Sequence, residues 1–432
     1  MSQVSFYLRR LLSKMWFLPA VFSAVAVLTI VVAFYLARWA PEELPFTITQ
    51  DAVQSILAIL ATSLLTVSVF ALSTLTAALS SASASTTPRA AQLIVGDRSA
   101  QTSISVFIGA FLFAILAILG LSAGIYSSAG RMLLFSVTLG VVALVIVALI
   151  RWIAQISDIG RVGHTVDRVE AATADALRTL NEHPLFDCRL LKGEPEGVAI
   201  GTDKLGYIQH FDAKRLQRLA SEHDLQIAVT ARPGAYVSAA RPLMTVQGEL
   251  DDKLKSELIR TFVVGDQRNF TSDPRFGLVV LAEIADRALS PGVNDPGTAI
   301  DVISTLTRLL CTWQPSTPTD ADNDRVAVQP LDPQDLLQDA FRPIARDGAG
   351  LIEVVLRLLH SLEIVAQLNP HLREAALTTG RDAAGRARQA LGAPGDLQAL
   401  HAAAEFCREP RMVLNCTVGE FAKDALKKRK LA

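Results

Sequence analysis

The sequence predicts an α-helical polytopic membrane protein with four transmembrane helices and a C-terminal α+β cytoplasmic region, a small β-rich module followed by a helical domain. Half of the 432 residues are hydrophobic and only 19% are charged, below the roughly 25% typical of soluble domains. The charges are also unevenly divided. Residues 1–150 carry 7 Lys and Arg and 4 Asp and Glu, whereas residues 151–432 carry 34 and 38. The first part therefore has the composition of a membrane segment and the second that of a water-soluble one.

Four apolar stretches define the predicted transmembrane domain, residues 1–152. Each is about as long as the roughly 20 residues that a membrane-spanning helix needs, and none contains Lys, Arg, Asp or Glu. They lie at residues 16–36, 52–79, 104–126 and 132–150. The first run is longer than the apolar core of a secretory signal, so we expect it to be retained as a span.

The orientation follows from the basic residues in the short flanks of the spans, which favour the cytoplasmic side. With both termini inside, eight basic residues lie on the cytoplasmic side: Arg9, Arg10, Lys14, Arg89, Arg98, Arg151, Arg161 and Arg168. Arg38 and Arg131 lie on the other side. Both termini, and with them the polar part of the chain, are predicted to be cytoplasmic. Trp16, Trp39 and Trp152 stand at span ends, where indole rings favour the interface.

The second span carries hydroxyl side chains at intervals of 7, 4, 7 and 7 residues, which places them on one helical face. They are Ser55, Thr62, Thr66, Ser73 and Ser80. One hypothesis is that this hydroxyl stripe lines a pore, because hydroxyls can replace part of an ion's hydration shell. The alternative is close helix packing, in which the hydroxyls bond back to helix carbonyls. The sequence leaves both open.

After the fourth span, apolar residues at helical spacing predict an amphipathic connecting helix and linker over residues 153–192. Residues 193–264 then change to short β-branched runs divided by Gly and Pro, which is typical of a β-rich module. We expect a strand at 206–212, a helix at 213–222 capped by Asp212, a strand at 225–230, and a turn with two further strands at 232–246.

The remaining residues, 265–432, predict a helical domain. Asp273 precedes Pro274 and Asp295 precedes Pro296, the arrangement of an N-cap followed by a first-turn proline. These signals predict a helix hairpin around the connector at 290–297. A Pro-, Asp- and Thr-rich stretch at 314–334 is expected to be a mobile surface loop, with further helices after it.

Several segments together resemble a known family. "RALSPGVNDPGTAID", "GDQRNFTSDPRFGLVVLAEIA" and "GYIQHFD", with the four-span N-terminal part, are similar to the uncharacterised bacterial membrane proteins catalogued as domain of unknown function 2254. The resemblance covers most of residues 5–420. It implies a place in the bacterial plasma (inner) membrane and no accepted activity. Its signature is a Ser-Pro-x-x-Asn-Asp-Pro turn, matched here by Ser290, Pro291, Asn294, Asp295 and Pro296, with Gly292 and Val293 where Ala and Ile are expected.

Carboxylate and guanidinium groups gather in this stretch and form a second candidate site. Besides the turn residues, the candidates are Arg268, Asp273, Asp286 and Arg287. Such groups can perform acid–base chemistry or bind an ion or ligand. The alternative, which we favour, is structural, because charges around a turn commonly cap helices and pair one helix with another.

Other classes of function are excluded or disfavoured. The formal net charge of −1 excludes a generally basic nucleic-acid binder. The four cysteines have no CxxC spacing and are expected to be buried thiols, so neither a metal site nor a cofactor is predicted. No nucleotide, acyl-transfer or zinc-protease motif is present. The basic tail at 423–430 could contact anionic lipid on the cytoplasmic face.

The leading hypothesis is a homo-oligomeric plasma-membrane channel or channel-like transport protein in the lipid bilayer. The second span would line the path, and the cytoplasmic part would form an assembly and gating collar. The first alternative is a membrane-anchored sensor or scaffold whose cytoplasmic part binds a ligand or protein. The second alternative is a membrane-bound enzyme that uses the carboxylates between residues 265 and 301.

Overall fold

The structure is a computed structural model that describes residues 17–37, 49–95, 98–124, 126, 128–156, 161–315 and 321–407. The chain forms two compact units, residues 7–165 and residues 166–432, called here the N-terminal and C-terminal units. The basic N-terminal cluster, Trp16, Trp39, Cys416 and the basic tail at 423–430 lie outside the described residues, so the predictions made on them stay predictions.

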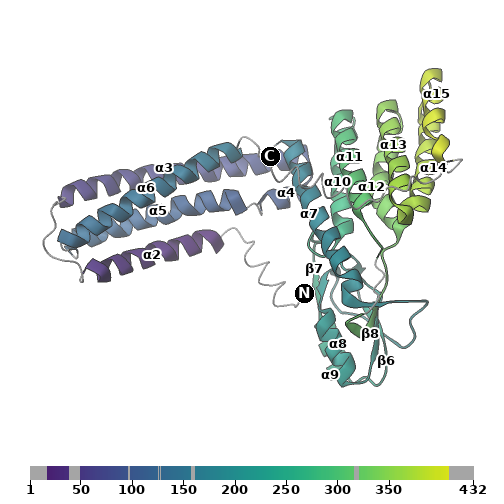
Figure 1. Ribbon diagram of the computed structural model, residues 1–432, viewed down its shortest axis with the longest axis horizontal. Helices are drawn as coiled ribbons and strands as arrows, with labels where there is room; N and C mark the ends of the chain where they lie inside the picture. Colours follow the sequence, from purple (N-terminus) through teal and green to yellow (C-terminus); the bar gives the residue numbers. More distant parts are fainter. Residues whose placement is uncertain are drawn as a thin grey trace. The chain divides into compact units, whose positions relative to one another are not determined.

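The N-terminal unit is helical (Figure 1). Its elements are α2 (Phe17–Ala37), α3 (Gln50–Ser85), α4 (Pro88–Val95), α5 (Arg98–Ser122) and α6 (Ser128–Ile156). Helix α5 is the central one, because α2, α3 and α6 all pack against it. Phe107, Phe113 and Leu121 of α5 are accordingly buried, which fits an apolar helix surrounded by others.

The predicted spans at 52–79 and 132–150 fall within α3 and α6, whereas the span at 16–36 begins one residue before α2 and the span at 104–126 extends past the end of α5 at Ser122. Among the described residues, three segments are long and apolar enough to cross a bilayer: 50–78, 102–122 and 130–155. Helix α2 is 21 residues long and contains no charged residue. A membrane protein is therefore supported, whereas the number of four spans and their topology stay predictions.

The C-terminal unit begins within α7 (Val162–Glu182). Arg308 donates from Nε and Nη2 to the two carboxylate oxygens of Glu170, both at 2.9 Å. A side chain at Gly277 would overlap the Thr173 side chain, so α7 approaches the backbone of a later helix closely. The amphipathic helix thus packs on its own unit.

Two sheets follow. The elements of this part are η1 (Pro184–Asp187), β1 (Cys188–Leu190), β2 (Val198–Ile200), β3 (Gly206–Phe211), α8 (Ala213–Glu222), β4 (Gln226–Val229), β5 (Tyr236–Val237), β6 (Met244–Gln247), α9 (Asp252–Ile259), β7 (Phe262–Gly265) and β8 (Asn323–Val328). The larger sheet has the order β1-β8-β4-β6-β2, with β8 parallel to both neighbours and the other pairs antiparallel. The smaller is the antiparallel β5-β3-β7.

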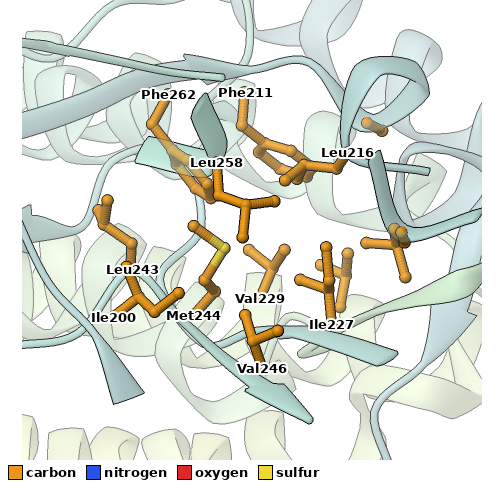
Figure 2. Close-up of a cluster of buried hydrophobic side chains, with 14 of the residues drawn as sticks. Ile200, Phe211, Leu216, Ile227, Val229, Leu243, Met244, Val246, Leu258 and Phe262 are labelled. Carbon is orange, nitrogen blue, oxygen red and sulfur yellow. The ribbon is translucent and has the colours of Figure 1, made fainter. Parts of the chain in front are cut away.

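One apolar core lies between the sheets and α8. Val229, Met244 and Val246 enter it from the larger sheet, and Phe211 and Phe262 from the smaller. Figure 2 shows these side chains converging, with Leu216 of α8 and Leu258 of α9 beside them. The two aromatic rings stack with centroids 5.6 Å apart. Alternating apolar residues along β4, β6 and β8 supply the side of this core that belongs to the larger sheet.

The position of β8 corrects the sequence analysis. The stretch at 314–334 was expected to be a mobile loop, but residues 323–328 form a strand inside the larger sheet. The β-rich module also exceeds its expected limits of 193–264, because β1 precedes residue 193 and β8 follows residue 264. The alternating Asn-Asp-Arg-Val-Ala-Val pattern was masked by the surrounding Pro and Asp residues. Val326 and Val328 are fully buried, so this strand belongs to the core.

The rest of the unit is a block of helices that lie side by side (Figure 1). They are α10 (Pro274–Leu289), α11 (Pro296–Thr312), α12 (Pro333–Asp347), α13 (Ile352–Leu368), η2 (Pro370–Leu372), α14 (Arg373–Ala390), α15 (Pro394–Ala403) and η3 (Glu405–Cys407). Helix α10 packs against α11 and α12, and α13 packs against α11 and α14. The predicted helix hairpin is present as α10 and α11.

Candidate functional site

The hydroxyl stripe lies on the outer face of α3. Ser55, Thr62, Thr66, Ser73 and Ser80 are all exposed. The buried face of the same helix consists of Val53, Leu57, Ala61, Leu64, Ala71 and Leu75. At about 100° per residue, the two sets lie on opposite sides of the helix. The hydroxyls therefore point away from the rest of their own unit, and packing against α5 does not explain them.

Hydrogen bonds within α3 determine which polar atoms of the hydroxyl stripe remain available on its outer face. Thr62 Oγ1 donates to the Ala58 carbonyl at 2.9 Å, and Thr66 Oγ1 donates to the Thr62 carbonyl at 3.1 Å. These are i−4 bonds within the helix, the back-bonding that the packing hypothesis assumed. Because each hydrogen is used internally, these hydroxyls present only oxygen lone pairs outward. The outer face of α3 consequently presents hydrogen-bond acceptors at Thr62 and Thr66.

Three further exposed residues complete the pattern. Ile59 is 67% exposed, Val69 is 59% exposed, and Thr76 is also exposed. Together with the five hydroxyls they form an alternating 4-3 series: Ser55, Ile59, Thr62, Thr66, Val69, Ser73, Thr76 and Ser80. This spacing is that of the a and d positions of a coiled coil. We call this set the α3 seam. The 4-3 spacing is visible in the sequence, but the sequence-based hypothesis included only the five hydroxyl residues.

The second candidate site begins at the N-terminus of α10, where Asp273 is the central residue. It is only 3% exposed, and its Oδ1 accepts from the backbone N–H of Phe276 at 3.2 Å, capping the helix. Arg268 Nε donates to its Oδ2 at 2.6 Å, and the same guanidinium lies over the Phe276 ring. Burial raises the pKa of Asp273, opposed by the hydrogen bond and charge of Arg268.

The β-rich part supplies a second wall around this carboxylate. Gly234 has φ +91°, and a side chain there would overlap the Asp273 carboxylate, so only glycine fits. Arg232, two residues earlier, donates from Nη1 to the Gln329 carbonyl at 2.6 Å and lies over the Phe186 ring. Burial lowers the pKa of Arg232 to about 10, and Asp273 opposes this shift.

The motif segments join through side-chain amides. Gln209 of β3 donates to the Gln267 carbonyl at 2.8 Å, and Asn269 donates back to the Gln209 carbonyl at 3.0 Å. These bonds fasten "GYIQHFD" to "GDQRNF". On the opposite side, Arg275 reaches Asp335 and Asp339 of α12, each at 2.6 Å. Sequence reasoning had assigned Gln209 to a strand and missed its role as a link.

The Ser-Pro-x-x-Asn-Asp-Pro turn stands at the other end of α10. Ser290 Oγ donates to the Arg287 carbonyl at 2.6 Å, and Asp295 accepts from the N–H and hydroxyl of Thr298. These hydrogen bonds lower the pKa of Asp295. Asn294 has φ +49°, a conformation that Asn tolerates better than most residues. Pro291 is exposed, and Pro296 opens α11, so Ser290, Asp295 and Pro296 each have a local structural role.

Asp286 lies one turn before this motif. Its pKa is raised to about 7, chiefly by burial and next by the negative charge of the neighbouring Asp347. Arg346 Nη2 lies 3.4 Å from its Oδ2, and Arg287 beside it is exposed. Since α10 rises about 1.5 Å per residue, Asp273 and Asp286 stand roughly 20 Å apart. The structure therefore divides the predicted carboxylate cluster into two separate groups.

The contacts of Asp273 and Arg275 connect α10 to the β-rich part and to α12. We call this arrangement the structural joint. In the described part of the chain, no group of three or more His, Cys, Asp or Glu residues is placed to hold a metal ion. The thiols of Cys188, Cys311 and Cys407 have their pKa values raised by burial, to about 12, 11 and 11. The Asp273 carboxylate faces a helix N-terminus and an arginine that already bind it.

Comparisons with known proteins extend this description. A family model described as "Predicted membrane protein (DUF2254)" matches residues 12–363. An uncharacterized protein of Mycobacterium tuberculosis strain H37Rv is 34% identical over 104 residues, which are 23% of this chain and 20% of that protein. An uncharacterized protein of Mycobacterium bovis shows the same values. The chain thus spans about a fifth of the length of these curated relatives. No solved structure matches it.

Proposed function

The chain belongs to the family of predicted membrane proteins catalogued as domain of unknown function 2254, and from this premise we propose that it is a homo-oligomeric channel or channel-like transport protein. In this proposal α3 lines the path around a symmetry axis, and the C-terminal unit forms a cytoplasmic collar for assembly and gating. The observation that carries the proposal is the exposed α3 seam, opposite the buried face of the same helix.

The seam supports self-association for a geometric reason. A 4-3 spacing keeps one face of a helix in register with a partner helix over several turns. The partner in this proposal is α3 of another subunit, because neighbouring copies supply the same spacing and the same uncharged surface. Closed cyclic symmetry is the usual way in which identical subunits surround a central path.

The chemistry of the stripe favours cations. Thr62 and Thr66 direct oxygen lone pairs outward while their hydrogens bond to α3 carbonyls. Oxygen acceptors replace the hydration shell of a cation, whereas an anion requires donors. The proposed permeant species is therefore a small monovalent cation. Because no charged side chain stands within residues 52–79, only hydroxyl oxygens would replace its water, and the cation would stay partly hydrated.

The polar residues of the C-terminal unit support a structural role rather than catalysis. Asp273 and Asp295 cap helices, and Arg268 and Arg275 bind carboxylates of their own unit. Groups that are engaged in this way are poorly available to a substrate. We infer that this joint keeps the collar rigid.

Flux through liposomes tests the proposal. Full-length protein is reconstituted, and potassium efflux is followed for wild type, Thr66→Trp and Leu72→Trp. Leu72 is 51% exposed on α3 but lies off the seam, so it controls for bulk on the same helix. We expect efflux from wild type and Leu72→Trp and its loss in Thr66→Trp.

Two outcomes would overturn the proposal. If correctly assembled wild type shows no efflux, the channel proposal is wrong. The sensor or scaffold alternative, in which the C-terminal unit binds a ligand or protein, would then be favoured. Equal efflux from both tryptophan variants would show that ions do not pass along the α3 seam.

A further inference from the structure

A cavity of about 580 Å³ lies at one edge of the larger sheet and has no part in the roles described above. Its wall is built from three places: the segment after β1, the residue after β4, and the linker from β8 to α12. All of its lining residues belong to the C-terminal unit. Its volume falls within the roughly 300–1,000 Å³ of small-molecule sites.

The cavity stands where three neighbouring strands end. Strand β8 is parallel to β1 on one side and to β4 on the other, so the carboxyl ends of all three lie at the same edge of the sheet. Leu191, Thr230 and Gln329 directly follow these strands, and each of them lines the cavity. In open sheets with parallel strands, ligands bind outside the carboxyl ends. The fold thus provides a typical position for a ligand.

The polar side chains around the cavity offer mainly hydrogen-bond acceptors. Asp332 Oδ1 accepts from the backbone N–H of Gln334 at 2.8 Å, which leaves Oδ2 without a partner among the described residues. Glu194 is exposed, and no described side chain pairs with its carboxylate. Thr230 donates its hydroxyl hydrogen to the Pro242 carbonyl at 3.4 Å, so its oxygen is left as an acceptor. A ligand with donors and positive charge complements this set.

The neighbouring cations do not fill this position. Lys192 lies between two lining residues in the chain, but it is exposed and does not line the cavity. Arg232 donates to the Gln329 carbonyl at 2.6 Å and lies over the Phe186 ring, so it is engaged by its own unit. The two carboxylates at the cavity are therefore available to an added cation.

The lining also indicates which kind of cation fits. A calcium ion takes roughly six to eight oxygen ligands, and within the described ranges no group of three His, Cys, Asp or Glu residues is placed to hold a metal. Leu191, Pro195 and Leu331 instead add aliphatic surface to the wall, against which a hydrocarbon chain can be buried. We propose that this cavity binds a small aliphatic amine in its ammonium form, with the charge beside the two carboxylates and the hydrocarbon part against the aliphatic surface.

This site is independent of the channel proposal, because α3 contributes nothing to it. Glu194 belongs to the β-rich part, whereas Asp332 caps α12 in the block of helices. A bound amine would therefore connect the two parts of the C-terminal unit. Loss of ion flux in liposomes and loss of amine binding are separate results, and neither implies the other.

Ligand-observed NMR of the full-length protein in detergent tests the proposal, with protein-free micelles as the background. The probes are butylamine, butanol and butyrate, which carry a short hydrocarbon chain and differ in charge. We expect butylamine to bind with a Kd in the millimolar range, as suits a ligand of few atoms. Butanol and butyrate should bind at least about five-fold more weakly, because neither provides the charge that complements the carboxylates.

Three variants locate the binding. Glu194→Gln changes an exposed side chain, and Asp332→Asn keeps a residue that caps a helix as well as Asp does, so both should fold. Each should raise the Kd for butylamine about five-fold. Glu196→Gln is the matched control, because Glu196 is an exposed carboxylate of the same segment that does not line the cavity. It should leave the Kd within about two-fold of wild type.

Several results would overturn the proposal. One is a wild type that does not bind butylamine above the micelle background. Another is equal binding of butylamine and butyrate, which would show that the carboxylates do not select a cation. A third is an equal effect of Glu194→Gln and Glu196→Gln, which would place any amine binding outside the cavity.

Discussion

The two units place their polar side chains in opposite ways. On α3 the hydroxyls stand on the outer face, opposite the side chains that bind the helix to its own unit. In the C-terminal unit the side chains of the family motifs face inward. Arg268 binds Asp273, and Gln209 exchanges hydrogen bonds with the segment that contains Arg268. The contrast teaches that a recognisable motif can be structural, while an inconspicuous stripe faces the surroundings. It also yields predictions that separate the two regions.

The largest effect is expected at the centre of the inward-facing network. Asp273→Ala leaves Arg268 without its carboxylate and removes the α10 cap, so the free energy of unfolding should fall by about 3–5 kcal/mol. Asp332→Ala is the matched control, because Asp332 caps α12 but is exposed and should cost about 1 kcal/mol. Thermal unfolding of the detergent-solubilised protein measures both. Equal losses in the two variants would contradict the buried network.

A smaller effect is expected where α7 approaches α10. Gly277→Ala places a methyl group against Thr173, and such overpacking costs about 1–3 kcal/mol. The double variant Gly277→Ala with Thr173→Ala removes the Thr173 hydroxyl and methyl and should recover part of the loss, because the Thr173 Cβ remains close to the added methyl group. If the double variant has the same melting temperature as Gly277→Ala, the close approach of α7 to α10 at these two residues is contradicted.

The signature turn predicts a smaller loss still. Asn294→Val forces a β-branched residue into φ +49° and should lower stability by about 1–2 kcal/mol. Asn294→Gly tolerates the same backbone and should change stability by less than about 0.5 kcal/mol. Chemical unfolding of both variants checks the order. Two equally destabilised variants would mean that the Asn294 side chain, rather than its backbone, matters.

The smallest effect is expected on the outward-facing stripe. Thr66→Val preserves shape and removes a hydroxyl that contacts only its own helix, so protomer stability should change by less than about 0.5 kcal/mol. Leu64→Ala on the buried face should cost about 2–5 kcal/mol, because Leu64 is 2% exposed. Melting of the two variants in detergent distinguishes the faces. A large loss of stability in Thr66→Val would contradict the outward-facing position of the stripe, and with it the contrast between the two units.

The sequence was informative where one local signal determines the structure. Uninterrupted apolar runs predicted α3, α5 and α6, and an aspartate before proline predicted the starts of α10 and α11. The hydroxyl stripe was recognised from its spacing alone. In each case the signal and the structure lie within the same few turns.

Long-range pairing was not predictable in this way. Strand β8 lies between β1 and β4, although more than 90 residues separate it from either along the chain. The contact of Gly234 with Asp273 and the ion pair of Arg346 with Asp286 likewise join distant segments. Such partners are selected by the packed fold, and no local pattern in a single sequence identifies them.

The central claim, that the α3 seam joins identical subunits around an axis, is tested most directly by the mass of the protein in lipid nanodiscs. Native mass spectrometry of the intact complex measures the number of subunits without labels or substitutions. The account predicts a closed oligomer of three or more subunits. A monomer or a dimer would contradict it, because neither can surround a central path with α3 helices.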